Sequence, residues 1–515
     1  MVRVVLVGGG HAHMMIIRRE LSRVSRYRLW KRGYGRGWEN DAKLRELELL
    51  LITNRPESVY SGMTPGVVAG RYEYEEAAVD VRSVCARAGW TVLIASVQAI
   101  SSSERIVRVY DKQKDVHLEI PYDILSINIG SEAKLPHASF LLGAQAGAAV
   151  VMTRPIAELE PFVRRFFEAQ AQAQAQVQVQ TESLAASASE NQTINVCVVG
   201  GGMAALELAF ALRQRACQYA PQMHNVLVQL IDAKMPEKSA LYTMIEHELA
   251  ARGIEHRRNV RAERLQLPHA GTPDQQLSVI LSDGSALPAH LVVLGTGAAA
   301  AAWLKTNTDL ALDAQGYVLV NQKLQSVSAP AVFAVGDCCG FGQLFGDDSF
   351  PPKAGVFSVR EAHVLAENIA SLAACLAAGN APLAADLKEY TPQREFLQLV
   401  SLGDGHAIGS KFGLAFSGAW VWWLKHHLDT SWMQQVTGSN KHAAPSRNVT
   451  PFGGSPAEAA AYLMSRHSSR DSFSVQLGVL QRMETDDAFC NEVRVVCRRS
   501  TKELYGIEEG SASSA

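Results

Sequence analysis

Two segments of the chain show the same order of hydrophobic and polar positions. VRVVLVGGGHAHMMIIRRE (residues 2–20) and INVCVVGGGMAALELAFAL (residues 194–212) each contain an aliphatic run, three glycines and an apolar pattern of helical period. A continuous apolar run is typical of a strand buried in a parallel sheet, and the periodic stretch after the glycines predicts a helix. The repetition predicts an α/β protein with two Rossmann-like dinucleotide-binding domains.

The second segment fits the G-x-G-x-x-G/A pattern of a dinucleotide turn. Gly200 permits the tight turn, Gly202 lets the backbone approach a pyrophosphate, and Ala205 allows close packing of helix on strand. The next apolar strand, NVLVQLIDAK, contains Asp232, and an acid at a strand end suits a ribose 2′-hydroxyl and repels a 2′-phosphate. We therefore favour NADH over NADPH, although Lys234 nearby leaves NADPH open.

The first segment is a less regular version of the same turn. Gly8 and Gly10 occupy the first two small positions, but His13 occupies the third. The next strand, LELLLIT, is followed by Asn54 in place of an acid, and this side chain can still hydrogen-bond a ribose hydroxyl. A histidine at the packing position should hold the helix slightly farther from the sheet, and it can face either the phosphates or the neighbouring strand.

Neither the histidines nor the cysteines predict a metal site. His11 and His13 are two residues apart, whereas ligands on one helical face are three or four apart, and no third ligand lies near them in the sequence. We expect a role for both beside a phosphate or in packing. The eight cysteines include no CxxC, which suggests reduced thiols.

Two segments look like insertions. Residues 168–193 are a low-complexity Ala- and Gln-rich stretch, which we interpret as an extended helix end or a flexible insertion. Residues 25–43 (SRYRLWKRGYGRGWENDAK) are basic and aromatic. Such a stretch can contact nucleic acid or a membrane, but we interpret it as a surface loop because the chain as a whole is nearly neutral.

The C-terminal part of the chain differs in its sequence pattern from the two dinucleotide-binding segments. REFLQLVSLGDGHAIGS (residues 394–410) predicts a hairpin, and GAWVWWLKHHLDTSWM (residues 418–433) predicts a Trp-rich helix. We favour packing of this helix on the first domain over docking on a membrane. After about residue 437 we expect two short helices and a disordered end.

Composition restricts the class of protein. The chain has 515 residues, 47% hydrophobic, 19% charged and a formal net charge of -2, so we expect two or three domains and no nucleic-acid partner. Strand-like sequence begins at Val2 and no apolar run approaches the roughly 18 residues of a membrane span. We therefore expect no signal peptide or transmembrane segment, and a location in the cytoplasm or peripherally on an organelle membrane.

Three later motifs carry a family resemblance. Together with the two turns, three motifs occur in the order of the family: IPYDILSINIGS (residues 120–131) between the turns, and VVLGTGAAAAAWL (residues 292–304) and LQSVSAPAVFAVGDCCG (residues 324–340) after the second. The chain resembles the pyridine nucleotide–disulfide oxidoreductase superfamily, whose members have two dinucleotide-binding domains. The resemblance implies FAD on the first turn, NADH on the second, and Asp337 on a flavin ribityl hydroxyl.

The resemblance also implies a division into domains, with the NAD domain inserted in the FAD domain. We expect an FAD-binding domain in residues 1–150 and 299–385, an NAD(H)-binding domain in residues 151–298, a C-terminal α+β interface subdomain in residues 386–470, and a partly disordered tail in residues 471–515.

Within the superfamily, the chain looks most like type II NADH dehydrogenases. Only Cys85 precedes Cys197, so the cysteine pair of the disulfide reductases is absent. GGGHAH, YSGMTPGVVAG, PPKAGVFSVREAHVLAENI and LVSLGDGHAIGSKFG also resemble the flavoprotein module that occurs alone or fused to selenide, water dikinase.

The resemblance implies hydride transfer from NADH to flavin N5 and then reduction of a small acceptor. A quinone is our first expectation, and a selenium compound is the alternative within enzymes. A flavin-binding redox sensor or structural protein of the apoptosis-inducing-factor type is the alternative outside them. Peripheral membrane contact and a homodimer are compatible with the resemblance.

The resemblance also assigns residues to roles. Glu207 would lie near the nicotinamide, while Lys353 would stabilise the reduced flavin. The expected FAD-binding residues are Gly8, Gly10, His11, Ala12, Asn54, Val97, Gly130, Gly336, Asp337 and Gly355. The expected NADH-binding residues are Gly200, Gly202, Ala205, Asp232 and Gly297.

Overall fold

A computed structural model gives the fold of the chain. It describes residues 2–20, 47–136, 140, 150–182, 193–219, 226–234, 239–267, 277–347, 350–438, 452–465 and 473–505. The basic and aromatic segment of residues 25–43 lies outside the described residues, as does part of the low-complexity segment (residues 183–192).

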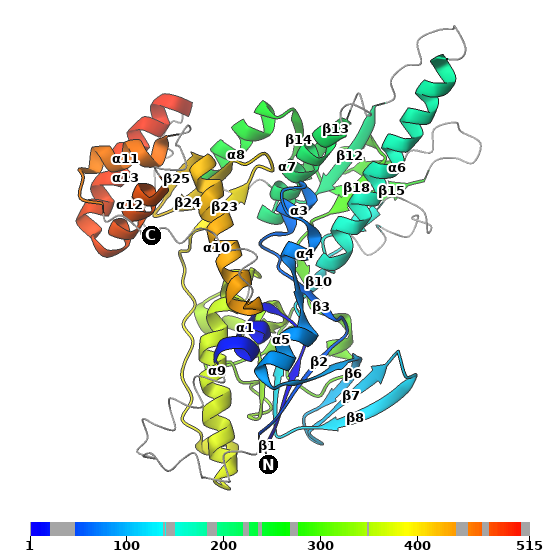
Figure 1. Cartoon of the computed structure of the whole chain (residues 1–515), viewed down its shortest axis with the longest axis vertical. Helices are drawn as coiled ribbons and strands as arrows, with labels where there is room; N and C mark the ends of the chain where they lie inside the picture. Colours follow the sequence, from blue (N-terminus) through cyan, green and yellow to red (C-terminus); the bar gives the residue numbers. More distant parts are fainter. Residues whose placement is uncertain are drawn as a thin grey trace.

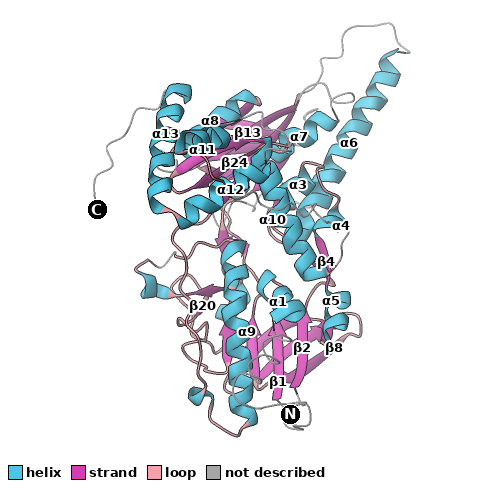
Figure 2. Cartoon of the chain, turned by 60° about the vertical axis from the view of Figure 1, so that its left-hand side comes forward, coloured by secondary structure: helices cyan, strands magenta, loops and turns pink. Residues whose placement is uncertain are grey.

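The first domain is built on a five-stranded parallel sheet in the order β21-β9-β1-β2-β5. Its strands are β1 (Val2–Val7), β2 (Leu47–Thr53), β5 (Thr91–Ile94), β9 (Ile124–Ile127) and β21 (Val332–Ala334). Helices α1 (His11–Met15) and α9 (Gly355–Ala377) pack together and cover one face of the sheet, as Figure 2 shows. The aliphatic runs that predicted β1 and β2 are buried here.

The second domain repeats this plan with a parallel sheet in the order β11-β18-β12-β13-β14. Its strands are β11 (Val150–Met152), β12 (Ile194–Val199), β13 (Val226–Asp232), β14 (Ile254–Arg258) and β18 (Leu291–Leu294), and its helices include α7 (Met203–Gln218) and α8 (Ala240–Ala251). All five of these strands precede β21 of the first sheet in sequence. The predicted α/β fold with two dinucleotide-binding domains is confirmed.

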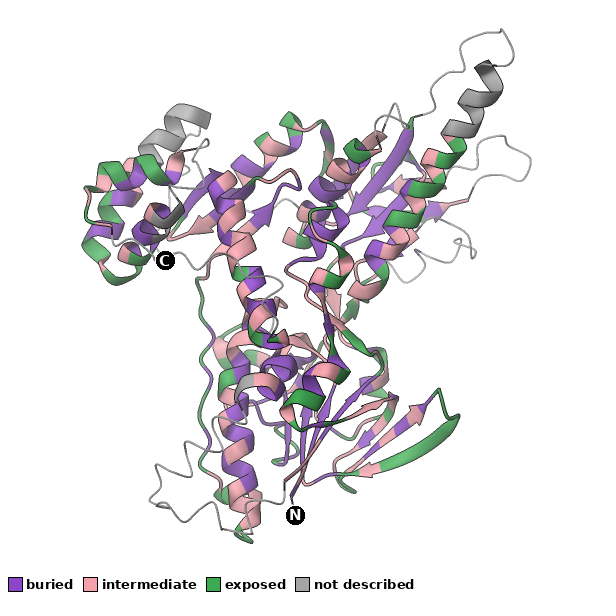
Figure 3. Cartoon of the chain, in the orientation of Figure 1, coloured by how far each residue is buried: buried purple, intermediate pink, exposed green. Residues whose placement is uncertain are grey.

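Each domain carries a smaller antiparallel sheet. The first has β6 (Ser96–Ser101), β7 (Ile106–Asp111) and β8 (Val116–Pro121), of which β8 is the exposed outer strand in Figure 3. The second has β15 (Ala262–Gln266), β16 (Leu277–Leu281) and β17 (Ala286–Ala289). Short elements between β2 and β5 are β3 (Glu57–Val59), α3 (Thr64–Val68), α4 (Tyr74–Ala77), β4 (Ala78–Asp80) and α5 (Val81–Ala88), of which α3 packs on α6 (Ile156–Glu182) and α7 of the second domain.

Helix α6 (Ile156–Glu182) extends outward from the second domain (Figure 1). Its last residues belong to the low-complexity segment, so residues 168–182 are the extended helix end that was one of the two predicted alternatives.

The C-terminal part contains three antiparallel strands and four helices among its described residues. β23 (Gln398–Ser401) and β24 (Ala407–Lys411) form the predicted hairpin, and β25 (Leu414–Gly418) adds a third strand. The predicted Trp-rich helix is α10 (Ala419–Thr437), which packs on this sheet and reaches α1 of the first domain (Figure 1).

The remaining C-terminal helices form one cluster. α11 (Pro456–Met464), α12 (Phe473–Thr485) and α13 (Asp487–Tyr505) share a hydrophobic core with α10 and the three strands. Two of these helices lie in the stretch expected to be a partly disordered tail, while residues 506–515 fall outside the described part of the chain. None of the helices described in the structure is long and apolar enough to cross a membrane.

Candidate active site

The first glycine turn connects β1 to α1 and lies against the end of β9. Gly8 has φ +95°, and a Cβ atom there would come within 2.7 Å of the Asn128 carbonyl carbon. A Cβ at Gly10 would overlap the Asn128 side chain. Both positions therefore require glycine. His11 and Ala12 follow directly and begin α1.

His13 is fully buried and bridges the turn to β9. Its Nδ1 lies 2.7 Å from the Gly8 carbonyl oxygen and its Nε2 lies 2.9 Å from the Ser126 hydroxyl oxygen. Because a carbonyl oxygen only accepts, Nδ1 carries the proton and Nε2 accepts from Ser126. Burial, opposed in part by the Gly8 hydrogen bond, lowers the pKa of His13 to about 4. His13 is thus a neutral packing residue that faces the neighbouring strand.

His11 has different neighbours from His13. Its ring makes edge contacts with Tyr60 at 5.2 Å and Trp432 at 5.1 Å between ring centroids. Burial lowers the pKa of His11, although the Asp337 charge opposes this effect. The two histidines do not converge, and within the described ranges no three His, Cys, Asp or Glu side chains form a group that could hold a metal ion.

Two of the residues expected to bind FAD lie outside the first glycine turn and the residues described above as contacting it. Asn54 is exposed in the bend after β2, and Val97 is half-buried in β6 beside a register shift. Ser58, which the sequence analysis did not select, donates to the Gly9 carbonyl at 2.6 Å. No motif marked Ser58, because its contact depends on how β3 returns toward the turn.

Asp337 lies directly after Gly336, where β21 ends. The Arg154 guanidinium lies 2.7 Å from Asp337 Oδ2, and the Ser131 hydroxyl donates to the same oxygen at 3.2 Å. Ser131 follows Gly130, which has φ +72° and open space where a Cβ would stand. Arg154 was missed in the sequence because it belongs to no motif.

Lys353 and Gly355 lie where α9 begins. The Lys353 amine donates to the Cys339 carbonyl and lies 4.0 Å from the centre of the Tyr317 ring, so this lysine is held and half-buried. A Cβ at Gly355 would come within 3.2 Å of His11 Nδ1. The start of α9 therefore meets the first glycine turn.

The second glycine turn has the predicted geometry. Gly200 has φ +138°, and a Cβ there would overlap the Gly295 carbonyl. A Cβ at Gly295 would come within 2.9 Å of the Ala205 Cβ, so Ala205 is the close-packing position. Gly295, not Gly297, makes this contact, because Gly297 is exposed and faces open space.

Asp232, the acid at the end of β13, lies against the second glycine turn. Asp232 is 4% exposed at the end of β13, and a Cβ at Gly201 would overlap its carboxylate. The Lys234 backbone N–H donates to Asp232 Oδ1 at 3.0 Å. A Cβ at Gly202 would meet no atom within 4 Å. The turn thus presents open backbone beside a buried carboxylate.

A buried charged cluster joins the two domains to α10. The Lys425 amine donates to Asp429 Oδ2 at 2.9 Å and to the Gly62 carbonyl at 2.7 Å. The Glu207 carboxylate accepts from the Ser401 backbone N–H at 2.8 Å. We call Glu207, Lys425 and Asp429 the junction cluster, because they come from α7 and α10 around the loop that contains Gly62.

The members of the junction cluster shift one another's pKa values. Burial raises the pKa of Glu207, opposed by the Lys425 charge and the Ser401 hydrogen bond. Burial alone would lower the pKa of Lys425, but Asp429 and Glu207 raise it above its usual value. The i,i+4 spacing of Lys425 and Asp429 in KHHLD is a sequence signal that could have identified this pair.

Aromatic rings extend the cluster toward the first turn. Asp429 hydrogen-bonds the Tyr60 hydroxyl, and burial together with the Asp429 charge raises the pKa of Tyr60. The Tyr60 ring stacks on Trp432 at 4.2 Å, and both rings contact His11. Contacts therefore run from the second domain through α10 to the turn expected to bind FAD.

The glycines fit two bound dinucleotides. Gly8, Gly10 and Gly200 allow backbone approaches that a Cβ would prevent, and Gly130 and Gly202 leave open space beside the two turns. Open backbone of this kind beside a turn is what a pyrophosphate requires.

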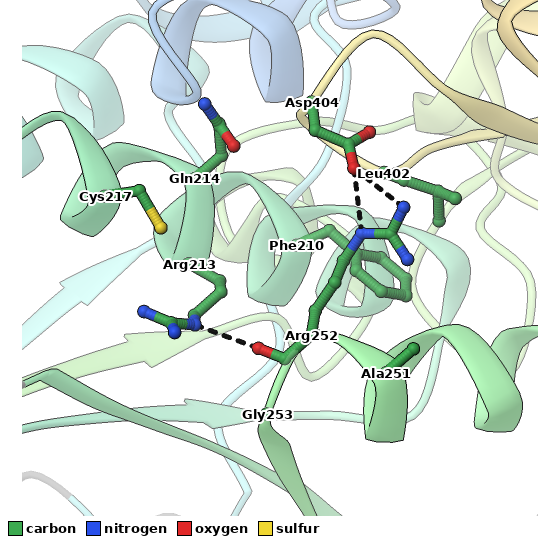
Figure 4. Close-up of a pocket in the computed structure, with 9 residues that line it drawn as sticks. All are labelled: Phe210, Arg213, Gln214, Cys217, Ala251, Arg252, Gly253, Leu402 and Asp404. Carbon is green, nitrogen blue, oxygen red and sulfur yellow. Dashed lines mark hydrogen bonds and ion pairs between the residues drawn. The ribbon is translucent and has the colours of Figure 1, made fainter.

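A separate open pocket of about 350 Å³ lies at the C-terminal half of α7 (Figure 4). There the Arg252 guanidinium donates to Asp404 Oδ2 at 2.7 and 3.1 Å, and Arg213 donates to the Arg252 carbonyl. The Gly200 turn precedes the opposite end of α7, so this pocket is distinct from the nucleotide turn.

Residues 37–364 match the pyridine nucleotide-disulphide oxidoreductase family, and the chain belongs to that family. It is similar to an NADH oxidase of Methanocaldococcus jannaschii, with 27% identity over 189 residues, which cover 35% of this chain and 37% of that protein. Matches to curated relatives span only 30–37% of those proteins' lengths.

Solved structures share the fold at low sequence identity. NDH2 from Plasmodium falciparum in complex with NADH has a TM-score of 0.62 at 11% identity, covering 85% of this chain and 96% of that chain. The sulfide:quinone oxidoreductase of Aquifex aeolicus has a TM-score of 0.57 at 16% identity, covering 85% of this chain and 92% of that chain.

Proposed function

We propose that the chain is an FAD-dependent NADH dehydrogenase that passes electrons to a quinone or another small acceptor. The observation that carries the proposal is the pair of glycine turns, each at the end of a parallel sheet and each accompanied by an acid, half-buried for the first turn and buried for the second. Asp337 accompanies the first turn and Asp232 the second. When bound, FAD would supply the group that takes a hydride and returns electrons.

The second turn supports NADH over NADPH. A 2′-phosphate would bring negative charge toward the Asp232 carboxylate, which is buried against Gly201, whereas a 2′-hydroxyl can donate to it. Asp232→Ala is expected to weaken NADH binding about tenfold while changing NADPH binding much less, measured as two dissociation constants on one variant. Equal losses for both nucleotides would contradict this assignment.

The junction cluster supports a proton-handling role near the nicotinamide. Glu207, with its pKa raised by burial, exchanges its proton closer to neutral pH than an ordinary glutamate does. Lys425 supplies one positive charge beside the carboxyl groups of Glu207 and Asp429. On the flavin side, Lys353 supplies a held positive charge where α9 begins.

A quinone is the acceptor we favour. The similarity to NDH2 and to a sulfide:quinone oxidoreductase supports this choice through the fold alone. The absence of a cysteine pair early in the first domain argues against a thiol relay, because Cys85 is the one cysteine before Cys197. A selenium compound is the alternative acceptor, suggested by the resemblance to the flavoprotein module that occurs alone or fused to selenide, water dikinase.

The test begins with purified protein loaded with FAD under anaerobic conditions. NADH is expected to bleach the flavin absorption, and a short-chain quinone is expected to restore it faster than selenite does. Protein that takes up no FAD would contradict the proposal. Bleaching that only selenite reverses would favour the selenium alternative, and NADH-dependent association without turnover would favour a redox sensor.

A further inference from the structure

One peptide group in the first domain is held at both of its polar atoms by buried side chains. The Val335 carbonyl accepts from Asn128 Nδ2 at 2.8 Å, and the Gly336 N–H donates to Glu361 Oε2 at 2.6 Å. Asn128 is 2% exposed and follows β9, while Glu361 is 1% exposed on α9. The peptide is therefore fixed between a strand and a helix.

Steric contacts fix the same peptide. Gly336 has φ +71°, and a Cβ there would come within 2.7 Å of Asn128 Nδ2 and 2.9 Å of Ser358 Oγ. The backbone cannot rotate this peptide without breaking both hydrogen bonds. Asp337 comes next, so the direction in which its carboxylate leaves the backbone depends on this peptide.

The other end of Asn128 reaches the first glycine turn. Its Oδ1 accepts from the His13 backbone N–H at 3.4 Å, and a Cβ at Gly10 would overlap it. Asn128 is separated by 115 residues from His13 and by 207 from Val335. One amide side chain thus touches both backbone segments that surround the expected FAD site, and it sets the distance between them.

We propose that Asn128 and Glu361 are positioning residues for FAD, because they hold the Val335–Gly336 peptide and so place Asp337 relative to the Gly8–Gly10 turn. This inference rests on the proposed function, in which both segments contact FAD. A lost hydrogen bond at a buried peptide leaves an unsatisfied polar group and lets the backbone shift. A shift of this peptide would change FAD affinity even if the rest of the fold remained intact.

The variants are chosen to keep shape and change one contact. Asn128→Asp keeps the volume and an acceptor for His13 N–H, but it presents an oxygen to the Val335 carbonyl. Glu361→Gln keeps an acceptor for Gly336 N–H, whereas Glu361→Leu removes it. Burial raises the pKa of Glu361 to about 7, against the Gly336 hydrogen bond and Lys353, so measurements at pH 8 begin from a largely ionised Glu361.

The measurement is the dissociation constant of FAD for each apoprotein, from quenching of flavin fluorescence. We expect Asn128→Asp and Glu361→Leu to raise this dissociation constant about tenfold or more. In Glu361→Gln the dissociation constant should stay within about threefold of the wild-type value. Asn368→Asp is the matched control. Asn368 is a second buried amide, which lies on α9 and donates to the Lys323 and Lys388 carbonyls. This control variant is expected to lower thermal stability without changing FAD affinity.

The outcomes separate this inference from the proposed function. Wild-type protein that binds no FAD contradicts the proposed function. Wild-type binding combined with unchanged affinity in Asn128→Asp and Glu361→Leu overturns the inference, as does an equal loss of affinity in Asn368→Asp. If Asn128→Asp does not fold, the comparison of Glu361→Leu with Glu361→Gln decides alone.

Discussion

His13 and Ser126 are joined across the interior of the first domain, with the Ser126 hydroxyl donating to His13 Nε2 at 2.9 Å. The same ring donates from Nδ1 to the Gly8 carbonyl. At a position where dinucleotide turns usually carry a small residue, the imidazole fills the space between helix and sheet and satisfies two polar groups. His13 therefore joins the helix to the sheet through hydrogen bonds, where a small residue would let the two pack directly.

His13→Ala should destabilise the fold by about 2–4 kcal/mol, because it leaves a cavity and unpaired buried groups on Gly8 and Ser126. The free energy of unfolding from urea titration measures this. His117→Ala on the exposed strand β8 is the control, with an expected change below about 0.5 kcal/mol. Similar losses in both variants would contradict the bridging role.

The low pKa of His13 also predicts a pH dependence of stability. Burial lowers this pKa from 6.5 to about 4, so the unfolded chain takes up a proton that the folded chain excludes. The contribution is present in full above about pH 6.5 and is lost as the pH falls toward 4, amounting to about 3 kcal/mol. His13→Ala should remove this part of the slope, and an unchanged slope in the variant would contradict the assignment.

Lys425→Met should cost about 3–5 kcal/mol, because it leaves the Asp429 carboxylate buried beside Glu207 without its cation. Adding Asp429→Asn should recover part of the loss, which a double-mutant cycle by urea unfolding measures. Lys388→Met removes the exposed pair with Glu367 and should cost less than about 1 kcal/mol. Strict additivity of the two junction substitutions would show that the pair is not coupled.

Gly202→Ala should separate nucleotide binding from folding. Gly202 has φ -77° and a Cβ there would meet open space, so stability should change by less than about 1 kcal/mol. The added methyl group would stand where a pyrophosphate approaches, so the dissociation constant of NADH should rise about tenfold or more. Gly200→Ala is the contrast and should fail to fold well, because φ is +138° there. Undiminished NADH affinity in Gly202→Ala would place the nucleotide elsewhere.

Asp404→Asn should loosen the attachment of the β23–β24 loop to the end of α8. Burial alone would raise the pKa of Asp404, but hydrogen bonds from His406 and Arg252 lower it to about 2. Its stabilisation is therefore present above about pH 4 and is lost as the pH falls toward 2. Because Asp404 is partly exposed, we expect a loss of about 1–2 kcal/mol at pH 7, measured by urea unfolding. Asp283→Asn in an exposed turn is the control.

Local patterns predicted the fold well because they depend on few neighbours. The aliphatic runs and glycines identified both sheets and both turns, and the periodicity of residues 418–433 identified α10. Two short helices were predicted after about residue 437, and the described residues there form three, α11, α12 and α13. Their hydrophobic faces become informative only when packed on β25 and α10.

The site was only partly predictable for the same reason. Ala205 follows from spacing within a motif, and its packing against Gly295 is the contact expected. Asp232 was chosen because it ends a predicted strand, and it lies against Gly201 of the turn. Asn128 and Arg154 make their contacts with residues far away in sequence, so no local pattern marks them. For Lys425, the one local signal is its i,i+4 spacing to Asp429. Gly297 was predicted as an NADH-binding residue, and the structure places it exposed beside open space, while Gly295 of the same motif packs on Ala205.

The order of strands has a consequence for how the protein is made. All five strands of the second sheet have been synthesised once Leu294 has left the ribosome, whereas the first sheet lacks β21 until Ala334 has followed. During that interval β9 has an unpaired edge, which is a site for non-native strand pairing. The second sheet can therefore be completed first, while the first sheet waits for its last strand and for α9.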